Sequence, residues 1–199
     1  MDLRLDHICG NEHAKRAAEV AIVGYHSILF LGTQNSEAGA LAKITRWAQA
    51  ECTKRYAEVR SESMSLCPCG LPEDMCCCDN EAIKLHQNKI ASAPTDIKVI
   101  VARPRTEKIM RWVAQEWIDG EPDEIIKDRI DEARERLRPP FVVDSAMQLL
   151  EVAARQLGLE PSQTKSVVSV AVTIAQMAGS ERVDAAHMAE AIQYQWRPG

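Results

Sequence analysis

The chain has 199 residues, a formal net charge of −5, and 46% hydrophobic and 27% charged residues. This length is enough to bury the core of one ordinary domain, with or without a small lid. The negative charge argues against a protein built mainly to coat nucleic acid, because such binding depends on neutralising phosphates. The apolar runs are too short to cross a bilayer, and no basic segment followed by an apolar one opens the chain. We therefore expect a cytoplasmic protein with no membrane partner.

The first half of the chain predicts alternating helices and strands. Apolar and small residues at helical spacing predict helices over 11–23, 38–54 and 80–90. Short runs of apolar or β-branched residues predict strands over 27–31, 56–64 and 96–102. The run 27–31 closes on a glycine and suits a buried parallel strand.

The second half predicts helices only, near 106–118, 122–137, 143–157, 161–178 and 184–195. Pro161 suits a first helical turn, Gly179 a C-terminal stop and Asp184 an N-cap. The change of pattern near 103–105 divides the chain into an α/β part over 1–103 and a helical part over 104–199.

Five of the seven cysteines are crowded into the segment 67–78. In a reducing compartment such a cluster indicates a metal site before it indicates disulfides. Zinc needs four thiolate or imidazole ligands in a tetrahedron, and two Cys-x-Cys pairs supply them. The predicted structural zinc ligands are Cys67, Cys69, Cys76 and Cys78. Cys77 is a bystander or a substitute, and His86 is the one histidine close enough in sequence to join. Free thiols, and disulfides formed on handling, remain open as alternatives.

Five stretches of the chain match, in order, the motifs of one known family. They are Gly10-Asn-Glu-His-Ala-Lys-Arg-Ala-Ala-Glu-Val-Ala, His26-Ser-Ile-Leu-Phe-Leu-Gly32, Cys67-Pro-Cys-Gly with Cys76 and Cys78, Gly120 to Arg136, and Val170–Gly179 with His187–Tyr194. On these residues the chain resembles the Mg-chelatase-like AAA+ ATPases of the ComM branch. The resemblance implies an α/β fold, a reduced AAA+ module. It has a core over 1–103, a parallel sheet of about three strands, and a C-terminal α-helical lid over 104–199.

The residues that bind ATP in that family are replaced here. In active members a glycine-rich loop presents backbone N–H groups to the phosphates, a lysine reaches the β- and γ-phosphates, and a threonine holds Mg²⁺. Here Ala38 stands in place of the lysine and Gly39 in place of the threonine, and Glu37 brings a carboxylate to the phosphates. The remnant of the nucleotide site is Gly32, Ser36, Glu37, Ala38 and Gly39, and we expect neither ATP nor Mg²⁺ as a cofactor.

Other catalytic parts of the family are also missing. The apolar run ending in Asp-Glu that holds Mg²⁺ has no counterpart between Lys43 and Cys67, and the resemblance implies that a long stretch of the relatives is deleted there. The segment 93–97 lacks the arginine of the family's P-L-L-D-R-I-D, and Ser162 stands where the family has another arginine. Because phosphoryl transfer depends on placing these charges, we expect no catalytic residues and no enzymatic turnover.

The deletion leaves a sheet that can still pair. The family places its strands in the order 5-1-4-3-2, so losing strands 2 and 3 leaves three neighbours. These are the runs near 96–102, 27–32 and 56–64. The run 56–64 then becomes a new edge, which must be covered or paired.

These observations favour a non-catalytic pseudo-ATPase that acts as a scaffold or regulatory subunit through protein contacts. The expected partner is a second copy or another protein at the edge strand 56–64. One alternative is an ATP-dependent motor subunit that works only with an intact homologue. Another is a DNA-associated accessory protein, which a basic surface stripe would favour. The mixed-charge run 121–138 is interpreted as a solvated helix with i,i+4 ion pairs.

Overall fold

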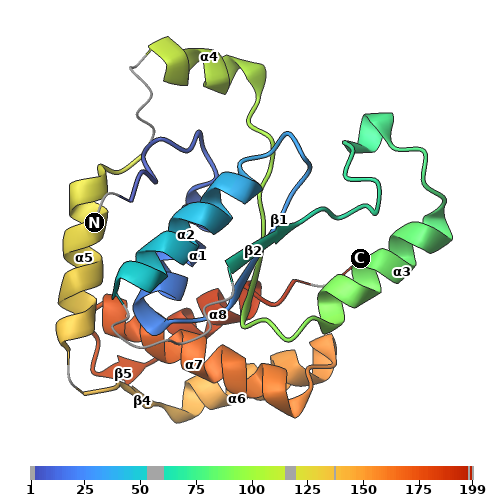
Figure 1. The fold of residues 1–199 in the computed structure, drawn as a ribbon. Coiled ribbons are helices and arrows are strands. Elements are labelled where there is room, and N and C mark those ends of the chain that lie inside the picture. The colour runs from blue at the N-terminus through green and yellow to red at the C-terminus, as the bar shows by residue number, and fades with distance from the viewer. Residues whose placement is uncertain (1–2, 53–60, 115–119, 137, 197, 199) are drawn as a thin grey trace.

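The computed structural model in Figure 1 describes residues 3–52, 61–114, 120–136, 138–196 and 198. The first half consists of α1 (Glu12–Gly24), β1 (Ile28–Leu31), α2 (Ala38–Cys52), β2 (Ser61–Met64), the 3₁₀ turn η1 (Glu73–Met75), α3 (Asn80–Ser92) and β3 (Ile97–Ile100). The second half consists of α4 (Thr106–Ala114), α5 (Asp123–Glu135), β4 (Phe141–Val142), α6 (Asp144–Leu157), α7 (Pro161–Met177), β5 (Arg182–Val183) and α8 (Ala185–Gln193). Among these described segments, no helix combines the length and the apolarity needed to cross a bilayer.

The three longer strands form one parallel sheet in the order β2-β1-β3. This is the order expected from the family sheet after loss of two strands, so the α/β class and the small parallel sheet are confirmed. β1 is buried along its whole length because both of its faces are covered. The predicted strand 56–64 is present as β2, and its part 56–60 lies outside the described residues.

Two layers of helices cover the sheet. On one face, α1 and α2 pack against the sheet, and Phe30 belongs to the large hydrophobic cluster there. α1 also packs against α5 and α7, so Leu150 and Ile174 of the second half belong to the same cluster. On the other face, Leu29 and Leu31 pack with Ile90 of α3. The central strand β1 is therefore buried on both sides, whereas residues 62–64 of β2 and Ile100 of β3 stay exposed.

The helix boundaries follow the predicted local signals. Pro161 lies in the first turn of α7, and Gly179 follows that helix with φ +66°. The side chain of Asp184 accepts hydrogen bonds from the backbone N–H groups of Ala186 and His187, which caps α8. These three predictions are confirmed.

The prediction that the second half is only helical is wrong in one detail. β4 and β5 form a two-stranded parallel sheet, with Phe141 beside Arg182 and Val142 beside Val183. Each strand lies immediately before the N-cap of a helix, where the backbone must be extended rather than helical. In this pairing the Phe141 N–H donates to the Glu181 carbonyl and the Val143 N–H to the Val183 carbonyl. A run of two residues carries no periodic signal in the sequence.

The carboxylate of Asp96 joins the starts of β1 and β3 to α7. Its Oδ2 accepts hydrogen bonds from the Ser27 backbone N–H at 3.0 Å and the Ser27 hydroxyl at 2.8 Å, and its Oδ1 accepts one from the Ser166 hydroxyl. Nearby, the buried His26 ring lies 2.8 Å from the Thr173 hydroxyl. Asp96 thus connects the sheet to the helical half.

The charged helix α5 differs from the expected solvated helix with local pairs. Arg129 Nη2 lies 2.9 Å from the buried Glu19 of α1 and 2.6 Å from Glu121. Burial raises the pKa of Glu19, and the neighbouring Arg129 opposes that rise. Arg134 donates to the carbonyl of Ile22. Arg129 and Arg134 therefore hold α5 against α1, while Arg136 forms an i,i+4 ion pair with Glu132 at 3.9 Å and donates to the carbonyl of Gln176 in α7.

Candidate metal centre and phosphate-loop remnant

The four predicted zinc ligands converge in the loop between β2 and α3. The Sγ atoms of Cys67, Cys69, Cys76 and Cys78 all lie within 4.8 Å of one another. Cys67 Sγ is 3.4 Å from Cys69 Sγ and 3.1 Å from Cys76 Sγ, and Cys69 Sγ is 3.7 Å from Cys76 Sγ. Zn–S bonds of about 2.3 Å in a tetrahedron place sulfurs about 3.8 Å apart. The cluster therefore has the donors, and nearly the spacing, of a tetrahedral thiolate site.

Local turn chemistry brings the first Cys-x-Cys pair into position. The Gly70 N–H donates to the carbonyl of Cys67 at 3.0 Å, and Gly70 has φ +75°, a conformation that favours glycine. The Cys67 N–H donates to the hydroxyl of Ser65 at 3.2 Å. On the other side, Asp79 caps α3 directly after Cys78. The sequence of this loop thus folds both thiol pairs toward one point.

The thiols of the cluster differ in acidity. Burial raises the pKa of Cys67 to about 12. The backbone N–H of Leu71 and the thiol of Cys67 lower the pKa of Cys69 to about 7. Metal binding requires the thiolate form, which the lowered pKa of Cys69 favours.

The remaining candidate ligands do not join the cluster. Cys77 is exposed and lies outside the group of four. The Nε2 of His86 lies 2.8 Å from the carbonyl of Ser65, so the ring contacts the backbone next to the cluster and not its centre. All four clustered cysteines are free thiols, and their sulfurs are too far apart for a disulfide bond.

The remnant of the phosphate loop, 32–39, connects β1 to α2 and is closed by its own hydrogen bonds. The N–H and the hydroxyl of Ser36 both donate to the carbonyl of Thr33, at 2.9 and 2.8 Å. The Ala38 N–H points to the Ser36 hydroxyl at 3.4 Å, and the Gln34 N–H donates to the carbonyl of Gly70 at 3.2 Å. Three backbone donors that a phosphate would need are therefore already engaged.

The five predicted remnant residues lie together but form no open cradle. The Ser36 hydroxyl oxygen is so close to Gly32 that a Cβ there would lie 2.2 Å from it. Ala38 is buried at 2% exposure and begins α2, and Gly39 lies in the first turn of that helix. The side chain of Ser36 thus occupies the hollow over Gly32.

The two positions where the family has arginines border one polar cavity of about 280 Å³. Its lining comprises Ser92, Ala93, Pro94, Thr95, Asp96, Gly158, Glu160, Ser162, Gln163 and Ser166. None of these described lining residues is cationic. The segment 93–97 and Ser162 are brought together, and they offer hydroxyl, amide and carboxylate groups where two guanidinium groups would be needed.

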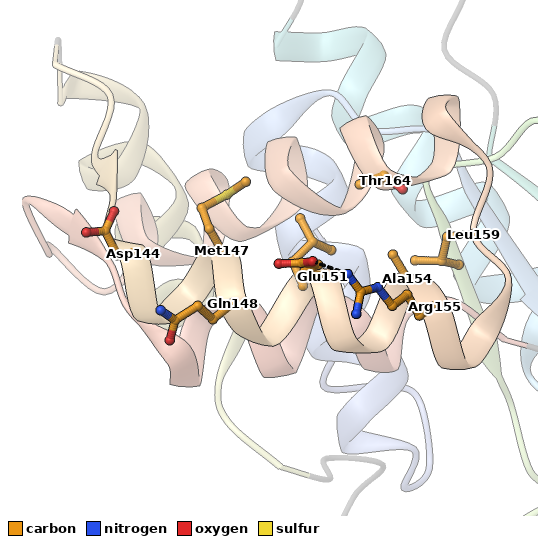
Figure 2. Close-up of a pocket in the computed structure, with 9 residues that line it drawn as sticks. Asp144, Met147, Gln148, Glu151, Ala154, Arg155, Leu159 and Thr164 are labelled. Atoms are coloured by element: carbon orange, nitrogen blue, oxygen red, sulfur yellow. Dashed lines mark hydrogen bonds and ion pairs between the residues drawn. The ribbon is translucent and has the colours of Figure 1, made fainter.

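Sequence reasoning missed a groove of about 690 Å³ along the outer side of α6. Figure 2 shows Met147, Glu151 and Arg155 along this helix, with an ion pair between the last two. Met147 is 46% exposed. Glu151 and Arg155 neutralise each other, and the described lining also contains Asp144, Gln148 and Thr164.

Comparison with protein families gives two matches. The model described as magnesium chelatase, subunit ChlI C-terminal, matches residues 91–195, and the model described as magnesium chelatase, subunit ChlI, matches residues 4–59. The stretch between the two matches holds the cysteine cluster. None of the curated proteins searched matches the chain.

Proposed function

The chain belongs to the magnesium chelatase ChlI family of AAA+ proteins, and from this premise we propose that it is a non-catalytic member. It is a pseudo-ATPase that acts as a scaffold or regulatory subunit through protein contacts. The observation that carries this proposal is the self-closed phosphate loop. The Ser36 hydroxyl lies over Gly32, and Ala38 and Gly39 supply neither a cation nor a hydroxyl ligand.

The energetics of the loop support the absence of nucleotide binding. To bind a triphosphate, the N–H groups of Gln34, Ser36 and Ala38 would have to leave their present acceptors. The incoming phosphates would also meet the carboxylate of Glu37, a like-charge approach that costs free energy in a partly desolvated site. No lysine is available at position 38 to offset either cost.

We expect calorimetry with Mg-ATP to give no binding tighter than about 1 mM, which is about −4 kcal/mol. A matched variant, Glu37→Gly with Ala38→Lys, removes the carboxylate and restores the cation. It is expected to bind more tightly than the natural chain if these two side chains are the obstacle. Micromolar affinity of the natural chain for Mg-ATP would refute the proposal and favour an ATP-dependent motor subunit.

We propose that the four clustered cysteines hold a structural Zn²⁺ ion. All four ligands are thiols of the chain itself, so a tetrahedral ion would be fully coordinated, as structural zinc sites are. The ion would fix the loop that supplies the Gly70 carbonyl to Gln34 of the phosphate-loop remnant. Metal binding would thereby stabilise the closed form of that loop.

We propose that protein contacts form at the β2 edge of the sheet. The opposite edge, at β3, is covered by the C-terminal segment, because the Lys98 N–H donates to the Tyr194 carbonyl and the Gln195 amide donates to the Asp96 carbonyl. On β2, residues 62–64 are exposed. Arg46 binds the Ser61 carbonyl, so the open part of this edge is short and centred on Ser63.

Substituting Ser63 by proline is expected to weaken self-association or partner binding at least about tenfold, about 1.4 kcal/mol. The Met64 carbonyl accepts from the N–H of Gly32, the residue after β1, so by strand alternation the Ser63 N–H faces away from β1, on the edge where another chain would pair. Proline removes that donor and is tolerated on an edge strand.

Analytical ultracentrifugation measures this effect, with Ser63→Ala as the matched control that keeps the N–H. The alanine variant should associate like the natural chain, within about twofold. A chain that is monomeric at all concentrations and captures no partner, or one that forms a hexameric ring without nucleotide, would contradict the edge contact.

A further inference from the structure

A cavity of about 580 Å³ lies at the carboxyl end of the sheet, between the cysteine loop, α3 and the segment after β3. Cavities of about 300–1,000 Å³ are the usual size for small-molecule sites. In open α/β sheets, ligands bind outside the carboxyl ends of the strands. Here the ends of β1 and β3 contribute Leu31 and Ile100 to the walls.

This cavity is not the nucleotide site of the family. Of the phosphate-loop remnant 32–39, Gly32 and Thr33 are among its described lining, and the segment 34–39 is not. It opens on the side of the sheet that carries α3, whereas α2, which follows the phosphate loop, packs on the opposite face. Loss of ATP binding therefore leaves this cavity in place.

The walls are apolar and the polar groups are few. Leu66 and Ile83 are partly exposed in the lining, and Ile100 remains 39% exposed there. Thr33 and Gln87 add hydrogen-bonding groups. An apolar ligand body would remove this exposed hydrocarbon from water, which favours binding.

The charge of the cavity is the opposite of that of the whole protein. Arg103 is the one charged side chain among the described lining residues, in a protein with a net charge of −5. Arg103 makes no ion pair with the other described residues. A guanidinium group beside an apolar cavity, with no carboxylate in the lining, suits an acidic group of a ligand.

We propose that this cavity binds a small organic anion with an apolar body against Leu66, Ile83 and Ile100 and one acidic group on Arg103. Cys67, Cys76 and Cys78 also line the cavity, so the metal cluster forms part of its wall. A Zn²⁺ ion held by four thiolates carries net negative charge. Zinc loading is therefore expected to weaken binding of the anion, which couples the two sites.

The test uses the fluorescent probe 8-anilinonaphthalene-1-sulfonate, which has an aromatic body and one sulfonate. We expect saturable binding to the intact protein at one site. Arg103→Gln should weaken it about tenfold, and Ile83→Trp, which fills the cavity, should abolish it. The matched control is Arg105→Gln, two residues away and outside the lining, which should change affinity less than twofold.

N-phenyl-1-naphthylamine, the same kind of body without the acidic group, separates charge from apolar contact. It should bind the natural chain and Arg103→Gln equally. Melting temperatures of the variants close to that of the natural chain exclude general unfolding as the cause. Equal effects of Arg103→Gln and Arg105→Gln, or unchanged probe binding in Ile83→Trp, would place the probe elsewhere and overturn the proposal.

Discussion

Removal of metal from protein isolated under reducing conditions is expected to lower its melting temperature by about 10 °C. A ligand present at a thousand times its Kd stabilises by about 4 kcal/mol, and each kcal/mol is worth about 2–4 °C for a chain of this size. The loss would begin in the segment 67–78. There the thiols would no longer be held together, and the Gly70 carbonyl would no longer be fixed beside Gln34.

The metal content before removal should be about one zinc equivalent per chain. Cys69→Ser removes one ligand and should abolish zinc retention and its contribution to the melting temperature. Cys77→Ser is the matched control, because Cys77 is exposed and outside the cluster. If metal analysis finds no zinc in protein that was never exposed to a chelator, the zinc proposal is wrong and the four cysteines are packed free thiols. Equal effects of the two variants would remove the cluster as the binding site.

Replacing Asp96 by alanine is expected to reduce the free energy of unfolding by about 3 kcal/mol. Its carboxylate accepts three hydrogen bonds from Ser27 and Ser166, and hydrogen bonds to a charged group contribute about 1.5–3 kcal/mol each. The expected loss equals the contribution of only one or two of these hydrogen bonds, because water can hydrogen-bond to Ser27 and Ser166 in the variant. Urea denaturation measures the loss, and Asp131→Ala on the exposed side of α5 should change stability by less than about 0.5 kcal/mol.

The Asp96 contribution also has a defined pH dependence. Burial acts to raise the pKa of Asp96, but the hydrogen bonds from Ser166 and Ser27 outweigh it and hold the pKa below its usual value. As the pH falls, the Asp96 carboxylate is therefore protonated at a higher pH in the unfolded chain than in the folded one. The stabilisation is fully present above about pH 4, the unfolded pKa, and is lost as the pH falls through the folded pKa. The stability difference between the natural chain and Asp96→Ala should accordingly shrink below about pH 4. A difference that stays constant to pH 2 would show that the charge of Asp96 contributes nothing.

The sequence alone determined the elements whose signals are local. The strand β1 was visible as a short apolar run, and the ends of α7 and α8 were visible in Pro161 and Asp184, because caps and periodicity act over a few residues. The four clustered cysteines could be named for the same reason, since two Cys-x-Cys pairs in one short loop have little freedom to separate.

Some features at the site could be decided only by contacts between distant segments. Whether His86 joined the cysteines depended on where α3 placed its ring, which lies against the Ser65 carbonyl. The sequence shows that the lysine at position 38 is lost. It does not show that Ser36 and the Gly70 carbonyl hydrogen-bond within the phosphate loop, because those contacts form only when the cysteine loop folds back onto the end of β1.

The sequence by itself thus determined the order of the elements, the strand neighbours implied by the family, and the residues missing from the ATP site. The tertiary structure decided the pairing of β4 with β5, the ion pair of Arg129 with Glu19, and the cavity beside Arg103. Each of the latter depends on groups far apart in sequence that meet only when the core packs. Local patterns report the conformational preference of a few residues, and they carry no information about which distant surface will lie beside them.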